Sequence, residues 1–329
     1  MTIHYRIHEV SEYINWVYFF HAWGFAPRFA TIADIHGCDS CRALWLARFP
    51  EAERAKAAEA MQLFKEARRM LNRLDEEGYQ THALFRLMDA NSEANDLWLE
   101  GTRFPLLRQQ TIREGKNNFC EDEIRKREGE NNFCEGEIRK REGENNFCEG
   151  EFYLCLADFV RPLSGGIKDR VGIFACSADA SMETRYPDDA YKRMLVQTLA
   201  DRLAEATAER LHEQVRKHIW GYAPDENLSI RQLHNEEFQG IRPAVGYPSL
   251  PDQSVNFLLD ELLDMKEIGI RLTENGMMQP HASVSGLMLA HPASRYFSIG
   301  RIDEGQLKDY AARRGLPVEE MRRFLGGNL

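Results

Sequence analysis

The feature that most constrains the fold of this chain is the irregular order of its helix-like and strand-like segments. Apolar residues recur at helical spacing within residues 51–76 and 187–220, whereas residues 153–160 and 171–176 are short apolar runs typical of buried strands. A doubly wound parallel sheet requires strands and helices in regular succession. The irregular order therefore predicts an α+β fold instead.

Shorter helices and a further strand are also predicted. Helices are predicted at residues 39–48, 258–268, 306–314 and 318–325, and a strand at residues 294–299. The aromatic-rich residues 8–23 are expected to pack against the core. Pro187 suits the first turn of the long helix, with Asp188 and Asp189 beside its positive end.

Composition limits the classes of function. The formal net charge of −10 argues against a nucleic-acid-binding surface, which would need a basic face. No apolar run reaches the length of a membrane span, and residues 1–13 contain several charged and histidine side chains, unlike a signal peptide. We therefore expect a cytoplasmic protein that contacts neither nucleic acid nor membrane.

Seven cysteines occur in the sequence, an odd number that does not favour a disulfide framework in a chain of this length. Cys38 and Cys41 form a C-D-S-C pair. One such pair supplies only two soft ligands, and no second C-x-x-C or H-x-H motif accompanies it. The pair is interpreted as two small residues in a turn or at a helix start, and no metal is expected.

A tandem repeat of 14 residues interrupts the chain. Residues 117–130 and 131–144 differ at one position, and residues 145–151 begin a further copy. Each copy has too few apolar residues to stack as a solenoid. We interpret residues of about 115–150 as a surface loop expanded by duplication within one domain of residues 1–329. A charged hairpin and a helical projection are both open, and a partner-binding arm is the alternative role.

Generic catalytic motifs are absent from the sequence. It has no G-x-G-x-x-G, no phosphate-binding P-loop and no G-x-S-x-G nucleophile elbow. His212 and His218 are six residues apart, which turns them to different faces of a helix and argues against a zinc site.

The stretch GIRPAVGYP, residues 240–248, has the features of a ligand-binding turn. Arg242 offers a planar fork suited to a carboxylate, and Gly246 allows a ligand to approach the backbone. Tyr247 could add a cation–π contact to a positive sulfur. The alternative is a structural turn with a surface arginine.

Two further patterns, taken alone, are interpreted as close packing and as a solvated helix face. Residues 272–286 and 291–297 contain small residues that permit close packing, and Tyr296 could face a ligand. An acidic stripe lies along the long predicted helix, with residues four apart on one face. Its members are Asp201, Glu205, Glu209 and Glu213.

Taken in order, these segments resemble a known family. The segments ADRLAEATAERLHEQVR, WGYAPDENLS, GIRPAVGYPSLPD, LTENGMMQPHASVSG, HPASRYFSIGRI and DYAARRG resemble the S-adenosylmethionine-binding activation domain of cobalamin-dependent methionine synthase. The resemblance runs from about residue 9 to the C-terminus and is densest over residues 195–329.

The resemblance implies a single C-shaped α+β domain around a twisted antiparallel sheet. It also implies a repair function, in which the domain docks on the cobalamin-binding part of methionine synthase and presents S-adenosylmethionine. An electron from flavodoxin or an equivalent donor then supports reductive methylation of inactive cob(II)alamin. The protein would contribute positioning and electrostatics.

The resemblance also assigns residues. Those that match the family's main S-adenosylmethionine motif are Arg242, Ala244, Gly246 and Tyr247, with Tyr296 on the other side of the ligand. Asp201 and Glu205 match two acids that meet a histidine of the cobalamin domain, which they would hold through charge-assisted hydrogen bonds.

The sequence also departs from the family's pattern. Asn15 stands where the family has an aspartate that helps bind the ligand, and Gln253 stands where it has a histidine. Asparagine keeps an acceptor but lacks the charge that favours an ammonium or a sulfonium. No homocysteine, folate or cobalamin module is present, so we expect a stand-alone protein that cannot make methionine alone and acts on a separate enzyme.

Two alternatives stay open. The chain could be a binding module that docks on a cobalamin-dependent methyltransferase without using S-adenosylmethionine. It could also activate a different corrinoid methyltransferase.

Overall fold

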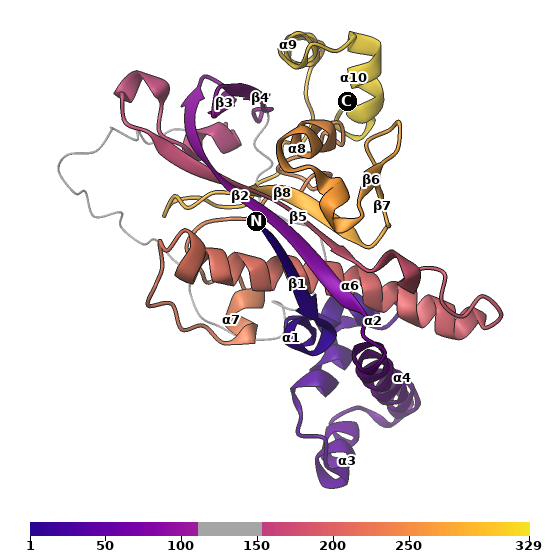
Figure 1. The fold of residues 1–329 in the computed structure, drawn as a ribbon. Helices are drawn as coiled ribbons and strands as arrows, with labels where there is room; N and C mark the ends of the chain where they lie inside the picture. Colours follow the sequence, from indigo (N-terminus) through magenta and orange to yellow (C-terminus); the bar gives the residue numbers. More distant parts are fainter. Residues whose placement is uncertain (111–152) are drawn as a thin grey trace.

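An antiparallel sheet forms the centre of the computed structural model, which describes residues 1–110 and 153–329 (Figure 1). Its strands are β1 (Thr2–Arg6), β2 (Gln80–Glu93), β3 (Asp96–Leu99), β4 (Thr102–Pro105), β5 (Asp169–Ala178) and β8 (Ser283–Met288). The main order is β4-β3-β2-β5-β8, and β1 pairs with the first residues of β2 on the edge opposite β5. The predicted α+β class with an antiparallel sheet is confirmed.

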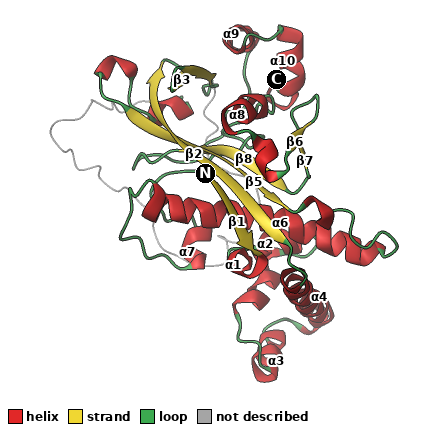
Figure 2. Cartoon of the chain, viewed as in Figure 1, coloured by secondary structure: helices red, strands yellow, loops and turns green. Residues whose placement is uncertain are grey.

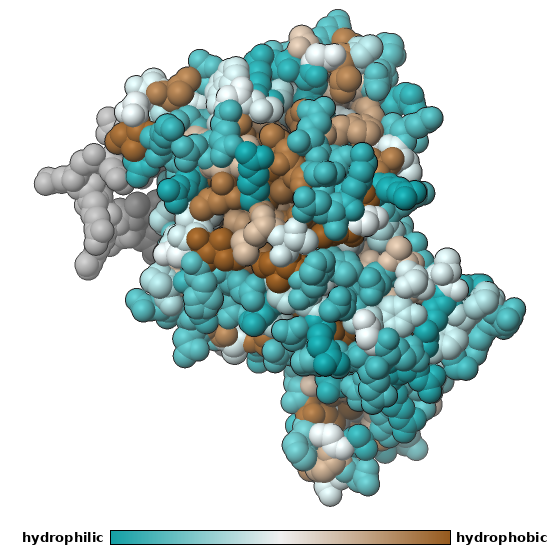
Figure 3. Space-filling view, in the orientation of Figure 1, coloured by the Kyte–Doolittle hydropathy of each residue, from teal (hydrophilic) through white to brown (hydrophobic). Residues whose placement is uncertain are grey.

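Helices cover both faces of this sheet (Figure 2). One layer contains α1 (Ile7–Ser11), α2 (Trp16–Ala22), α3 (Asp39–Ala47), α4 (Glu51–Glu76), α6 (Ala190–Gln214) and α7 (Ile230–His234). The other contains α8 (Val255–Leu263), α9 (Glu304–Arg314) and α10 (Val318–Phe324). Because side chains alternate along a strand, Phe174 and Cys176 of β5 join the core under α6, while Ile173 and Ala175 join the core under α8. In Figure 3, apolar residues gather between the two helical layers.

Short elements connect these layers. A two-stranded sheet pairs β6 (Arg271–Leu272) with β7 (Met278–Gln279). The 3₁₀ turns are η1 (Pro27–Asp34), η2 (Leu156–Phe159), η3 (Leu163–Gly165), η4 (Ala180–Met182), η6 (Met265–Ile268) and η7 (Gly326–Asn328). A π-helical turn, η5 (Val215–Ile219), continues α6.

Several predicted helices are confirmed, together with the residues at which they end. The helix predicted at residues 51–76 is α4, and α9 ends at Gly315 in the left-handed conformation. The long helix begins later than expected: Asp189 is its N-cap and accepts from the Lys192 backbone N–H at 3.0 Å. Pro187 therefore lies before the helix and not in its first turn.

Two predicted strands are wrong, and one predicted helix is divided. Within residues 153–160, the Asp158 carboxylate accepts from the Cys155 backbone N–H at 2.8 Å, which favours the turn η2 over a strand. Residues 294–299 are irregular because their backbone bonds go to a loop, as in Ile299 N–H to Pro248 O. The helix predicted at residues 258–268 breaks at Asp264, whose φ is 54°.

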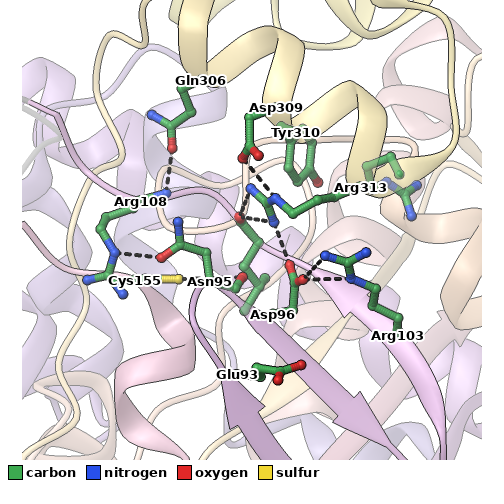
Figure 4. Close-up of polar contacts among 12 residues, drawn as sticks. Glu93, Asn95, Asp96, Arg103, Arg108, Cys155, Gln306, Asp309, Tyr310 and Arg313 are labelled. Carbon is green, nitrogen blue, oxygen red and sulfur yellow. Dashed lines mark hydrogen bonds and ion pairs between the residues drawn. The ribbon is translucent and has the colours of Figure 1, made fainter.

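A buried ion-pair network fastens α9 to the sheet (Figure 4). Asp96, only 4% exposed, accepts from Arg313 of α9 at 2.5 Å and from Arg103 of β4 at 2.6 Å. Arg313 also donates to the Leu106 carbonyl and to Asp309. These bonds satisfy a buried carboxylate that would otherwise destabilise the fold.

No helix among the described residues is both long and apolar enough to cross a membrane. The repeat at residues of about 115–150 lies outside the described residues.

Candidate functional site

The acidic stripe of α6 lies at the edge of the core and not on a freely solvated face. Leu199, Leu203 and Ala206 of the same helix are buried against the sheet. The adjacent acids consequently face neighbouring elements of the chain. Each of the four acids has a partner in the chain: His281 for Asp201, Tyr247 for Glu205, Arg242 for Glu209, and Tyr13 and Lys217 for Glu213.

The segment of residues 241–247 runs antiparallel beside β8. Ile241 exchanges backbone hydrogen bonds with Leu289, and the Val245 N–H donates to Ser285 O at 2.9 Å. Side-chain alternation buries Ile241 and Val245 in the core under α8, and places Ala244 in the core under α6. The same alternation places Arg242 on the α6 side, opposite the acidic stripe.

Gly286 of β8 makes this pairing possible. A Cβ atom there would lie 2.2 Å from the Pro243 carbonyl oxygen and 2.9 Å from the Ala244 Cα atom. Only glycine permits so close a backbone approach. Gly246 follows with φ of +86°, in the left-handed region, and turns the chain toward Tyr247.

Arg242 is the centre of the cluster. Its Nη2 donates to Glu209 Oε2 at 2.9 Å, and the two side chains are only 13% and 12% exposed. Burial acts to lower the pKa of Arg242, but the Glu209 carboxylate and other nearby groups outweigh it and raise that pKa. Glu209 Oε1 is buried without a hydrogen-bond partner among the described residues.

His212 lies on the other side of the guanidinium. Its Nδ1 is 3.2 Å from Arg242 Nη1, which can only donate, and its Nε2 is 3.3 Å from the Tyr222 hydroxyl. Burial first, and then the charges of Arg242 and Arg216, hold the pKa of His212 well below its ordinary value. His212 is therefore neutral, with its proton on Nε2.

Two tyrosines complete the cluster. The Tyr296 hydroxyl accepts from the Arg242 backbone N–H at 2.9 Å, and burial raises the pKa of Tyr296 to about 12. The Tyr247 hydroxyl donates to Glu205 Oε1 at 2.8 Å, and the Glu205 charge, followed by burial, raises the pKa of Tyr247. The Tyr247 side chain is nevertheless 52% exposed, so its ring is accessible.

Helix α2 reaches the same region from the N-terminal part of the chain. Asn15 is its N-cap and accepts from the Val17 backbone N–H at 3.1 Å. One turn later, the Tyr18 ring lies under Arg202 of α6, with 6.0 Å between the guanidinium carbon and the ring centroid. The start of α2 therefore faces the segment of α6 that carries the acids.

The structure brings together Arg242, Tyr247 and Tyr296, which the sequence grouped as ligand-binding residues. It also places Glu205 against Tyr247, although the resemblance assigned Glu205 to the contact with the cobalamin domain. Asp201 lies further along α6, where its Oδ1 is 3.3 Å from His281 Nδ1. Sequence reasoning missed the contributions of Glu209 and His212. Their signal was present, because residues 209 and 212 are three apart and share a face of α6.

Comparison with known proteins identifies the family. A sequence model described as "Vitamin B12 dependent methionine synthase, activation domain" matches residues 6–138 and 121–315. The chain belongs to this family. The two matched segments overlap at residues 121–138, inside the 14-residue repeat.

A solved structure supports the assignment to the activation-domain family. The chain is similar to the MetH reactivation domain in a crystal structure with AdoHcy bound, with 34% sequence identity and a TM-score of 0.77. The similarity covers 100% of this chain and 90% of that one. The family and fold inferred from the sequence are therefore confirmed.

Proposed function

We propose that this chain binds S-adenosylmethionine at the Arg242 cluster and supports reductive methylation of cob(II)alamin in a separate cobalamin-dependent methionine synthase. The observation that carries the proposal is the similarity, over the whole chain, to a reactivation domain whose crystal structure contains AdoHcy. AdoHcy is the product that remains when S-adenosylmethionine gives up its methyl group. The electron would come from a flavodoxin-like donor.

The residues of the cluster fit such a ligand. The unpartnered buried oxygen Glu209 Oε1 is an acceptor for an ammonium group. Arg242 contacts Glu209 and His212 through one hydrogen of each Nη atom, which leaves its other N–H groups to donate to a carboxylate. The exposed Tyr247 ring suits a flat base or a sulfonium. Bound S-adenosylmethionine would supply the methyl group, while these residues bind and orient it.

Calorimetric titration with S-adenosylmethionine tests the proposal. We expect saturable binding by the intact protein and binding weakened about tenfold or more in Arg242→Ala, because charge-assisted hydrogen bonds are lost. Arg313→Ala is the matched control, since it removes an arginine of similar exposure that pairs with Asp96 on the other face of the sheet. Arg313→Ala should be less stable yet bind normally. Equal weakening of S-adenosylmethionine binding in both variants would show that Arg242 stabilises the fold and does not bind the ligand.

The same titration includes Asn15→Asp. Aspartate caps a helix as well as asparagine does, so the fold of α2 should persist. The added charge should tighten binding if this side chain faces the positive part of the ligand. Unchanged affinity would remove residue 15 from the proposed site.

One observation favours a second candidate function. Arg242 is already paired with Glu209 and His212, which would be sufficient for a purely structural role. In that case the chain is a module that docks on a cobalamin-dependent methyltransferase without using S-adenosylmethionine. An absence of binding by the intact protein would favour this function over the first.

A further inference from the structure

Cys38 and Cys41 lie at the start of α3, away from the Arg242 cluster. Cys38 is the N-cap of this helix, and its sulfur accepts from the Cys41 backbone N–H at 3.2 Å. The two Sγ atoms are 2.8 Å apart, and both side chains are half-buried. In Figure 1, α3 lies beyond α4 as seen from the sheet.

Neighbouring contacts hold this helix start in place. Trp45 of α3 is 1% exposed, and its indole N–H donates to the Thr31 hydroxyl of η1 at 3.0 Å. Its ring packs edge-on against Phe49, with 4.7 Å between the centroids. The turn that carries His36 and Cys38 is therefore fixed at both ends, so the two sulfurs stay adjacent.

We propose that Cys38 and Cys41 form a reactive dithiol that undergoes thiol–disulfide exchange with low-molecular-weight disulfides, with Cys38 as the nucleophile. This inference is independent of the proposed function. The position of Cys38 at a helix N-terminus, with a second thiol three residues later, favours a thiolate there.

The two thiols have opposite electrostatic environments. Hydrogen bonds from Cys41 and His36 lower the pKa of the Cys38 thiol to about 7. The hydrogen bond with Cys38 raises the pKa of Cys41, which therefore stays protonated until it is needed. The buried Cys155 and Cys176 contrast with this pair, because burial raises the pKa of both thiols.

The exchange balances in two steps. The Cys38 thiolate attacks one sulfur of the small disulfide, which forms a mixed disulfide and releases one thiolate that takes up a proton. Cys41 then gives its proton to His36 or water, and its sulfur attacks Cys38 Sγ, which releases the second thiol. The protein dithiol is oxidised by two electrons, and the small disulfide is reduced to two thiols.

A divalent cation is the competing occupant. The ligand atoms of His36, Cys38 and Cys41 lie within 4.8 Å of one another, and they are the only such trio among the described residues. Two thiolates on one tetrahedral zinc would be about 3.8 Å apart, given zinc–sulfur bonds of about 2.3 Å. The observed separation of 2.8 Å lies between that value and the disulfide bond length of about 2.05 Å, so the two sulfurs are closer than a shared zinc would hold them and are placed to form a disulfide.

The test uses the full chain with Cys120, Cys134 and Cys148 replaced by serine, so that only the four described cysteines remain. The reduced protein is equilibrated with oxidised glutathione, quenched with acid and mapped by mass spectrometry. We expect a Cys38–Cys41 disulfide in this protein, a stable glutathione adduct on Cys38 in Cys41→Ser, and neither product in Cys38→Ser.

Alkylation rates provide the second measurement. At pH 7 a thiol with a pKa of about 7 is half ionised and one at the ordinary value of 9.0 is about 1% ionised, but lower basicity makes each thiolate less nucleophilic. The two effects together predict alkylation of Cys38 about sixfold faster in the folded protein than in the protein unfolded with guanidinium chloride.

Two results would overturn the proposal. One is a folded protein that forms neither the disulfide nor the adduct and alkylates no faster than the unfolded chain. The other is a reduced protein that retains one zinc per chain, lost in Cys38→Ser, with both thiols protected from alkylation. The second result would make the trio a metal site.

Discussion

At the scale of single residues, His212 carries the clearest dependence on pH. It is fully buried between Arg242 and Tyr222, and its folded pKa lies well below the ordinary value of 6.5. As pH falls below about 6.5, the unfolded chain takes up a proton that the folded chain does not. The contribution of His212 to the free energy of unfolding is therefore largest above that pH and decreases as the pH falls.

The substitution His212→Gln tests this effect, because a glutamine side chain keeps a donor and an acceptor without titrating. Between pH 7 and pH 5, the intact protein should lose more unfolding free energy than His212→Gln, by up to about 1.4 kcal/mol per pH unit. Urea unfolding at several pH values measures the difference. The exposed His218→Gln is the control and should follow the intact protein. Parallel curves for the intact protein and His212→Gln would contradict the assignment.

At the scale of elements, ion pairs attach the C-terminal helices to the rest of the chain, and these pairs contribute unequally to stability. Arg313 of α9 pairs with the buried Asp96, whereas Arg322 of α10 pairs with Glu304 at 2.7 Å on the surface. Removing one partner of a buried pair leaves an uncompensated charge, while exposed pairs contribute little.

We therefore expect Arg313→Ala to lower the unfolding free energy by about 2–3 kcal/mol, because Asp96 loses one charge-assisted partner but keeps Arg103. Arg322→Ala should lower it by about 1 kcal/mol or less. Chemical denaturation of the two variants measures both values. Similar losses of unfolding free energy in the two variants would show that the network in Figure 4 stabilises the fold no more than a surface ion pair does.

At the scale of the whole molecule, the family resemblance assigns Asp201 to a contact with the cobalamin-binding partner. In the isolated chain, Asp201 is 34% exposed and its carboxylate contacts the exposed His281. A partner histidine could take the place of His281 without unfolding any element. Docking would then require only a change of hydrogen-bond partner.

Asp201→Asn tests this contact. It should reduce stimulation of reductive methylation in a separate cobalamin-dependent methionine synthase by about tenfold or more, while S-adenosylmethionine binding is unchanged. Asp188→Asn makes the same charge change at an exposed position before α6 and should stimulate normally. Equal stimulation by Asp201→Asn and the intact protein would remove Asp201 from the interface.

The sequence by itself determined the helices whose signals are local. The apolar spacing of residues 51–76 and the left-handed Gly315 gave α4 and the end of α9, because periodicity and capping depend on near neighbours. The same is true of Cys38 and Cys41, for which a turn and a helix start were both open and which lie at the start of α3. The ordered motifs also indicated the family, which the comparisons confirm.

Only the tertiary structure decided the central strand and the state of the site. β2 was not anticipated, because its polar residues Arg86 and Asp89 obscure the pattern. Arg86 pairs with Glu100 and donates to the Leu262 carbonyl, and Asp89 pairs with Lys168, so their partners lie outside the strand. Residues 294–299 have the composition of a strand but find no strand partner.

Likewise, no local pattern could show that Arg242 pairs with Glu209, since that contact exists only because Gly286 lets the segment of residues 241–247 pack beside β8. Contacts between residues distant in sequence depend on which elements pack together, and only the tertiary structure determines that packing.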